Sequence, residues 1–196
     1  MIGLLPADPV KRGRIKLLAL AAFFALPVIA GYAAYFLDWA PGARANYGLL
    51  IAARPLPDTR FESADGKPFR FADLRGKWLL VQLDSGQCDA YCERKLYFMR
   101  QVRKALGKDT PRVERLWLLT DARQPSTALL EAIEGTLLAR ASGSAIAGEF
   151  PAEHAVSDHI YLVDPHGNLM MRYPRDADPS RMLKDLQRLM RVSRIG

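Results

Sequence analysis

The first feature of the hydrophobic pattern is one long, uninterrupted apolar run near the N-terminus. Residues 17–37 contain no charged side chain. At about 1.5 Å per residue, a helix of this length covers roughly 30 Å, the thickness of the hydrocarbon core of a membrane. The pattern therefore predicts a transmembrane helix over residues 17–37, preceded by a basic segment over residues 1–16.

The charges on the two sides of this run predict its orientation. Only Arg44 and Arg54 follow it closely, whereas it is directly preceded by Lys11, Arg12, Arg14 and Lys16. Since basic segments stay in the cytoplasm, we expect a cytoplasmic N-terminus and a periplasmic C-terminal part, anchored in the inner membrane. A cleavable signal peptide is the alternative, because Ala43-Arg44-Ala45 resembles a cleavage site. The apolar region of a signal peptide is normally shorter, about 7–15 residues.

After the run, alternating and apolar segments predict β-structure. Residues 38–57 are rich in Ala, Gly and Pro and predict a linker, and residues 58–196 predict one domain. A hairpin is expected around Asp65-Gly66, between residues 61–63 and 68–71. Predominantly apolar runs are typical of buried strands, and they occupy residues 78–83, 113–119 and 160–163. The last run is predicted to pair with residues 169–173 across a turn.

Apolar residues at helical spacing predict three helices in this domain. They run from Cys92 to Gly107, from Pro125 through Leu137, and from Pro179 to Arg191. The segment 141–151 is predicted to be a loop. The resulting order of elements, β–α–β–α–β–β–α, predicts an α/β fold of the thioredoxin-like kind, with a mixed sheet flanked by helices.

Composition narrows the possible roles of the cysteines and of the positive charge. A chain of 196 residues can bury a core without disulfides, so its two cysteines are expected to serve chemistry. The net charge of +7 includes a basic C-terminal tail, which fits a solvated helix face or an attraction to anionic lipid or an acidic partner. No nucleic-acid-binding module is recognisable, and no nucleic acid partner is predicted.

The candidate chemistry lies at the two cysteines, where the first buried strand gives way to a helix. If that helix begins near Gln87, Cys88 and Cys92 lie on one face with their Cα atoms about 6 Å apart, within reach of a disulfide. The same spacing lets two thiolates share a metal ion, and the amides of a helix N-terminus favour a thiolate. The pair therefore predicts a redox or metal site. The alternative is two small buried apolar side chains.

These features together resemble the Sco/SenC family of membrane-anchored, thioredoxin-like proteins that assist copper delivery to cytochrome c oxidase. The resemblance covers roughly residues 55–192. It rests on the single anchor and on Asp65-Gly66-Lys67, Asp73-Leu74-Arg75-Gly76-Lys77-Trp78, Cys88-x-x-x-Cys92 and the segment from Asp158-His159 to His166-Gly167. The chain is also similar to short anchored proteins of proteobacterial cytochrome oxidase assembly clusters. It departs from the family pattern, which usually has a proline between or beside the cysteines, because no proline lies between them here and Glu93 follows Cys92.

The resemblance implies that the chain is a copper-handling or thiol-redox factor. Cys88 and Cys92 would be the redox pair and two copper ligands. His159 is preferred as a third ligand because it opens a strand, His154 is the alternative, and His166 is expected to be exposed in a turn. The implied partners are the lipid bilayer and either a cytochrome c oxidase subunit or another copper chaperone. Two other functions stay open: a thiol–disulfide oxidoreductase for exported partners, and a non-catalytic assembly scaffold.

Overall fold

The structure is a computed structural model that describes residues 9–36, 46–63, 66–141, 145–193 and 195. The chain divides into two compact units, Met1–Ala45 and Asn46–Gly196. The first unit contains helix α1 (Pro9–Phe36), in which Val10–Ala34 is long and apolar enough to cross a membrane. Parts of five sequence predictions lie outside the described residues: the basic segment at 1–8, the end of the anchor and the linker at 37–45, Asp65 of the hairpin turn, and 142–144 of the predicted loop.

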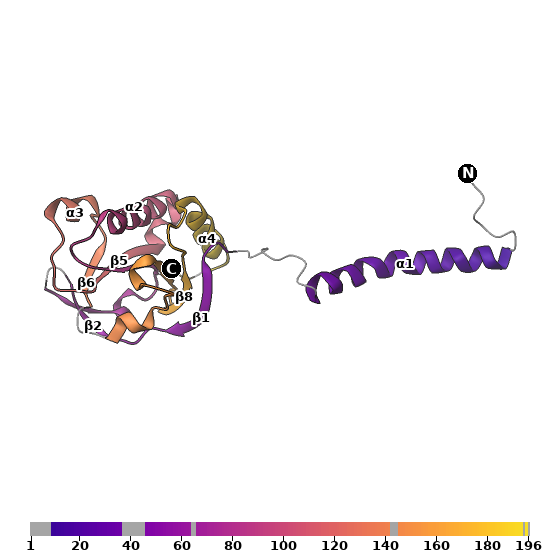
Figure 1. Cartoon of the computed structure of the whole chain (residues 1–196), viewed down its shortest axis with the longest axis horizontal. Helices are drawn as coiled ribbons and strands as arrows, with labels where there is room; N and C mark the ends of the chain where they lie inside the picture. Colours follow the sequence, from indigo (N-terminus) through magenta and orange to yellow (C-terminus); the bar gives the residue numbers. More distant parts are fainter. Residues whose placement is uncertain (1–8, 37–45, 64–65, 142–144, 194, 196) are drawn as a thin grey trace. The chain divides into compact units, whose positions relative to one another are not determined.

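The second unit is built on a mixed sheet, which has eight strands within the described residues (Figure 1). Their order is β1-β8-β7-β4-β5-β6-β2-β3. The strands are β1 (Leu49–Pro55), β2 (Arg60–Ser63), β3 (Pro68–Arg70), β4 (Trp78–Asp84), β5 (Val113–Leu119), β6 (Leu137–Arg140), β7 (Ile160–Val163) and β8 (Asn168–Arg172). β4, β5 and β6 are parallel to one another, so their carboxyl ends meet at one edge of the sheet.

The central strand β4 packs on both faces of the sheet. Its side chains alternate between two apolar clusters, with Leu79 and Val81 in one and Leu80 in the other. On the first face the cluster also contains Phe71 and Ile146, which come from the 3₁₀ helices η1 (Phe71–Leu74) and η3 (Ala145–Glu149). The other face is covered by α2 (Ala90–Ala105), α3 (Thr127–Ala132) and α4 (Pro179–Val192), which Figure 1 shows along one side of the sheet.

The thioredoxin-like arrangement predicted from the hydrophobic pattern is confirmed. The predicted apolar strands correspond to β4, β5 and β7, and the predicted helices after Cys92 and Pro179 correspond to α2 and α4. The hairpin strands β2 and β3 pair as expected and extend the same sheet through β6. Two further 3₁₀ helices, η2 (Gly107–Arg112) and η4 (Val156–Asp158), connect the main elements.

The helix predicted from Pro125 through Leu137 is wrong in its second half. α3 ends at Ala132, and Gly135 has a φ of +76°, a left-handed conformation that glycine adopts at little cost and that commonly ends helices. The chain then forms β6, which pairs in parallel with β5. Leu138 and Ala139 are the buried residues of this strand, so the helical spacing of Leu137 is coincidental.

The linker predicted over residues 38–57 extends too far toward the domain. Leu49–Pro55 forms the edge strand β1, paired antiparallel with β8. Most of its side chains are exposed or half-buried, so burial imposes little alternation on the sequence. The segment 141–151, predicted as a loop, likewise contains the short helix η3 with Ile146 buried.

Candidate redox and metal site

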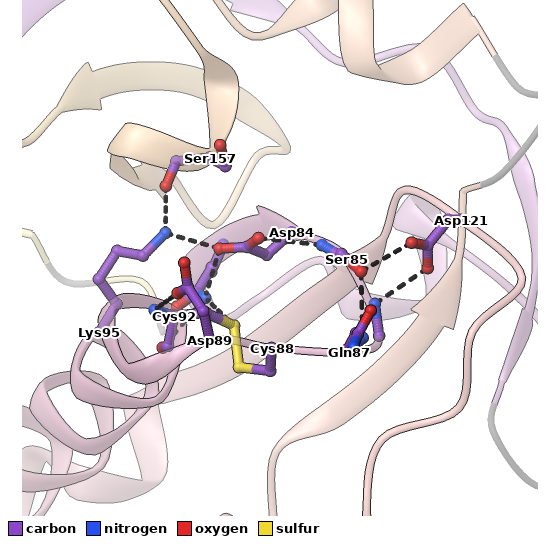
Figure 2. Close-up of a disulfide and its surroundings, with 11 residues drawn as sticks. Asp84, Ser85, Gln87, Cys88, Asp89, Cys92, Lys95, Asp121 and Ser157 are labelled. Atoms are coloured by element: carbon purple, nitrogen blue, oxygen red, sulfur yellow. Dashed lines mark hydrogen bonds and ion pairs between the residues drawn. A yellow bond between two sulfur atoms is a disulfide. The ribbon is translucent and has the colours of Figure 1, made fainter.

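Cys88 and Cys92 form a disulfide at the junction between β4 and α2 (Figure 2). Their Cα atoms are 5.2 Å apart, close to the separation expected from the sequence. The helix begins at Ala90, later than the start near Gln87 considered from the sequence, and Asp89 caps it by accepting a 2.8 Å hydrogen bond from the backbone N–H of Cys92. Cys88 therefore lies before the helix, in a turn with a φ of +29°, while Cys92 lies in its first turn.

The two sulfur-bearing residues differ in their access to solvent. Cys88 retains 8% of its surface exposed, whereas Cys92 retains none. Cys88 is therefore the more accessible of the two residues. Because Cys92 lies in the first turn of α2, the amides at the helix N-terminus stabilise negative charge on its sulfur.

A buried glutamine on β4 contacts Cys92 directly. The side-chain amide Nε2 of Gln82 donates hydrogen bonds to the Sγ of Cys92 at 3.2 Å and to its carbonyl oxygen at 3.3 Å. An N–H donor aimed at sulfur favours the thiolate over the thiol. Gln82 was not among the residues predicted from the sequence, although its signal is visible: it is the one polar residue inside the apolar run 78–83.

An ion pair lies beside the disulfide, between the end of β4 and the second turn of α2. Lys95 Nζ is 2.9 Å from Asp84 Oδ2, with only 5% of the lysine side chain and 16% of the aspartate side chain exposed. The ammonium also donates to the carbonyl oxygen of Ser157 and lies 4.9 Å from the ring centroid of Tyr91. Burial lowers the pKa of Lys95, and the attraction of Asp84 opposes this shift only in part.

The loop between β4 and Cys88 is held by a carboxylate from the neighbouring strand. Asp121, just beyond β5, accepts hydrogen bonds from Ser85 Oγ at 2.7 Å and from the backbone N–H of Gly86 at 3.0 Å (Figure 2). These hydrogen bonds lower the pKa of Asp121 below 3.8. The parallel pairing of β4 and β5 explains the contact, because it brings both carboxyl ends to the same edge.

Replacing Asp121 with asparagine is expected to loosen this loop and to speed reduction of the disulfide. Because its folded-state pKa lies below 3.8, the carboxylate of Asp121 contributes its full stabilisation of the loop at pH values above 3.8. This contribution is lost as the pH falls through the folded-state pKa. Reduction rates by a phosphine, followed from pH 7 downward, should therefore differ between the two proteins at neutral pH and converge only in strong acid. A constant ratio at all pH values would contradict this role.

Gly86 is required at its position because the backbone of Arg123 crosses it closely. A Cβ on Gly86 would lie 1.9 Å from the carbonyl oxygen of Arg123. Gly86→Ala is expected to lower the free energy of unfolding by about 2 kcal/mol, since backbone must shift. Gly148→Ala is the matched control, with no atom within 4 Å of its Cβ. Urea unfolding of the oxidised proteins measures both, and an equal effect of the two substitutions would contradict the prediction.

The structure does not group either candidate histidine with the cysteines. His159 is buried at the start of β7, with its Nδ1 2.9 Å from the carbonyl oxygen of Tyr173, while His154 and His166 are exposed. Burial lowers the pKa of His159, which favours the neutral imidazole. Among the described residues, no set of three or more His, Cys, Asp or Glu side chains is arranged to hold a metal ion.

The fold and this site define a thioredoxin-fold protein with a closed disulfide at the strand-to-helix junction. Residues 78–193 match the family model described as the transmembrane-like, thioredoxin-like, C-terminal domain. The chain belongs to this family.

Solved structures with the same fold include Sco proteins and a thiol–disulfide oxidoreductase. Yeast Sco1 with copper bound has a TM-score of 0.59 and 16% identity, covering 71% of this chain and 96% of that one. Apo Sco1 from Thermus thermophilus has a TM-score of 0.59 and 22% identity, covering 76% and 99%. The thioredoxin domain of an oxidoreductase from Bacteroides vulgatus has a TM-score of 0.55 and 16% identity, covering 71% and 98%. The resemblance to Sco/SenC proteins is thus confirmed for the fold.

Proposed function

We propose that this chain is a membrane-anchored copper-handling and thiol-redox factor whose Cys88–Cys92 pair cycles between disulfide and dithiol. The observation that carries the proposal is the disulfide itself, which joins the two cysteines of the chain beside a hydrogen-bond donor and a buried ion pair. Its closure spans a single turn, which removes little chain entropy, so a purely structural role accounts poorly for it. The apolar helix α1 supports the anchor.

The reduction step follows from the unequal exposure of the two cysteines. A partner thiolate attacks the Sγ of Cys88, the S–S bond breaks, and its electron pair leaves on Cys92 as a thiolate. Gln82 and the amides of the first turn of α2 stabilise that thiolate. A second partner thiolate then displaces Cys88, which leaves the partner oxidised and this chain a dithiol.

The dithiol is the form proposed to bind Cu(I). Cuprous ion prefers soft thiolate ligands, and closing the disulfide removes both of them. Two similar proteins, yeast Sco1 and ScoI from Bradyrhizobium japonicum, were solved with copper bound, which supports copper as the substrate here. We propose a periplasmic location on the inner membrane and, as the receiving partner, a cytochrome c oxidase subunit or another copper chaperone.

Anaerobic titration of the full-length chain in detergent with Cu(I) tests this function. We expect one Cu(I) per chain after reduction and none while the disulfide is closed, with stoichiometry read by native mass spectrometry and affinity by chelator competition. Equal binding by the oxidised and reduced chains would contradict the proposal. Failure of the reduced chain to compete for Cu(I) at micromolar chelator would do the same.

The third ligand is proposed as His159, through the Nε2 that its hydrogen bond to Tyr173 leaves free to coordinate, with His154 as the alternative. Because neither histidine is grouped with the disulfide, reduction must be accompanied by movement of the segment around Cys88. His159→Asn retains a donor near the Nδ1 position and removes Nε2. It is expected to weaken Cu(I) binding about 10- to 100-fold, whereas His154→Asn leaves it unchanged. The reverse result would assign the ligand to His154.

A further inference from the structure

The exposed face of α4 carries positive charge along its whole length. Its basic residues recur at helical spacing on the solvent side, and its apolar residues face the sheet. The basic residues are Arg181, Lys184, Arg188 and Arg191, referred to below as the α4 basic face. Within the described part of the chain, none of these four forms an ion pair with a carboxylate, and Arg181 lies 4.0 Å above the ring of Tyr47.

The carboxylate that α4 does contain serves a different purpose. Asp185 is buried and accepts hydrogen bonds from the backbone N–H of Tyr47 at 3.0 Å and of Gly48 at 2.9 Å. These two residues are among the first of the second unit. Tyr47 and Gly48, which follow the segment that leads from α1, are therefore hydrogen-bonded to α4 next to its basic face.

The tether from the proposed anchor to this point is short. α1 ends at Phe36, and residues 37–45 separate it from Asn46. Even fully extended, such a segment reaches only about 30 Å. Attraction between exposed charges acts over about one Debye length, roughly 8 Å at physiological salt, so the tether contributes by keeping the effective concentration of the bilayer high.

We propose that the α4 basic face binds the anionic lipid headgroups of the membrane that α1 anchors, an inference that rests on the anchoring part of the proposed function. Four exposed cations on one face complement a negatively charged surface, and the tether removes most of the cost of bringing the two together. The proposal does not depend on copper or on the state of the disulfide, so its failure and that of the copper titration are separate results.

This contact would also set where the disulfide faces. α2 and α4 pack against each other. The backbone N–H of Asp176, just before α4, donates to the Tyr91 hydroxyl in the first turn of α2, and Arg112, beyond the end of α2, donates to the carbonyl oxygen of Met190. The N-terminal ends of α2 and α4 therefore adjoin, and the disulfide lies at that end of α2.

The test uses the full-length chain in nanodiscs of phosphatidylcholine alone or mixed with phosphatidylglycerol. Acylation of Lys184 by a soluble reagent, read by mass spectrometry, reports on the α4 basic face, and Lys67 in the β2–β3 hairpin is the internal reference. We expect Lys184 to react at least about fivefold more slowly in the anionic discs, with the rate restored by high salt and Lys67 unaffected.

Variants separate this face from net charge. Arg188→Glu/Arg191→Glu should remove the protection of Lys184, and Arg188→Lys/Arg191→Lys should keep it. The control Arg60→Glu/Arg75→Glu makes the same change in net charge at two exposed residues outside α4 and should also keep it. Protection that is equal in the two lipids, insensitive to salt, or lost equally in the control would overturn the proposal. Protection that needs an added acidic protein would also overturn it, in favour of a protein partner.

Discussion

Cys92→Ser is expected to leave a reactive thiol at Cys88 that has no second cysteine with which to form a disulfide. Cys88→Ser is expected to leave an unreactive thiol at Cys92. The physical reason is exposure, since Cys88 keeps 8% of its surface in solvent and Cys92 is fully covered. Alkylation by iodoacetamide should be at least about tenfold faster in the Cys92→Ser chain, because rate follows access as well as thiolate fraction. Equal alkylation rates in the two variants would contradict this assignment of entry and leaving sulfur.

Both substitutions are expected to weaken Cu(I) binding by about three orders of magnitude, since each removes one of two soft ligands. Chelator competition under anaerobic conditions measures this loss. The wild-type chain and Gly148→Ala, which changes no atom near the site, should be indistinguishable and serve as controls. Full binding by either serine variant would place copper elsewhere in the molecule.

The same variants separate the three possible functions. Stable mixed disulfides between the Cys92→Ser chain and exported proteins would favour a thiol–disulfide oxidoreductase, for which the closed disulfide is the specific supporting observation. Copper binding without such capture would favour the copper-handling role. Normal oxidase assembly in a strain with both cysteines replaced would instead support a scaffold.

The sequence was sufficient to predict that Cys88 and Cys92 lie close together between a buried strand and a helix, because the signals for this position are local. The apolar runs of β4 and β5 mark buried strands, and a strand followed by a helix places the intervening pair at the sheet edge. Strands β1 and β6 could not be predicted in the same way. β1 is an edge strand with exposed side chains, and β6 exists because β5 offers it a parallel partner, a contact between distant segments.

The polar surroundings of the disulfide could not be predicted from the sequence, because they form through tertiary contacts. Gln82 and Lys95 are polar residues in segments whose strand and helix were predicted from their apolar residues. Only the packing of α2 on β4 shows that both are buried beside Cys92. The histidines illustrate the same limit. Sequence spacing could place His159 at the start of a strand, but not show that its Nδ1 is committed to the Tyr173 carbonyl.

Lys95→Met is expected to lower the free energy of unfolding by about 3–5 kcal/mol, because it leaves the carboxylate of Asp84 buried without its counter-ion. Methionine has a similar shape, so loss of packing contributes little. Lys104→Met, on the exposed side of the same helix, is the matched control and should change stability by less than about 0.5 kcal/mol. Urea unfolding with the disulfide closed measures both.

A double variant and a pH series identify the cause. Asp84→Asn combined with Lys95→Met removes the unpaired carboxylate charge. The free energy of unfolding should then return to within about 1 kcal/mol of the wild-type value. Because burial holds the pKa of Lys95 below 10.5, the unfolded chain binds this proton more tightly, so the lysine makes stability rise with pH between its folded-state pKa and 10.5. Lys95→Met should lack that rise. A double variant no more stable than Lys95→Met alone would show that packing, rather than the unpaired carboxylate, accounts for the loss.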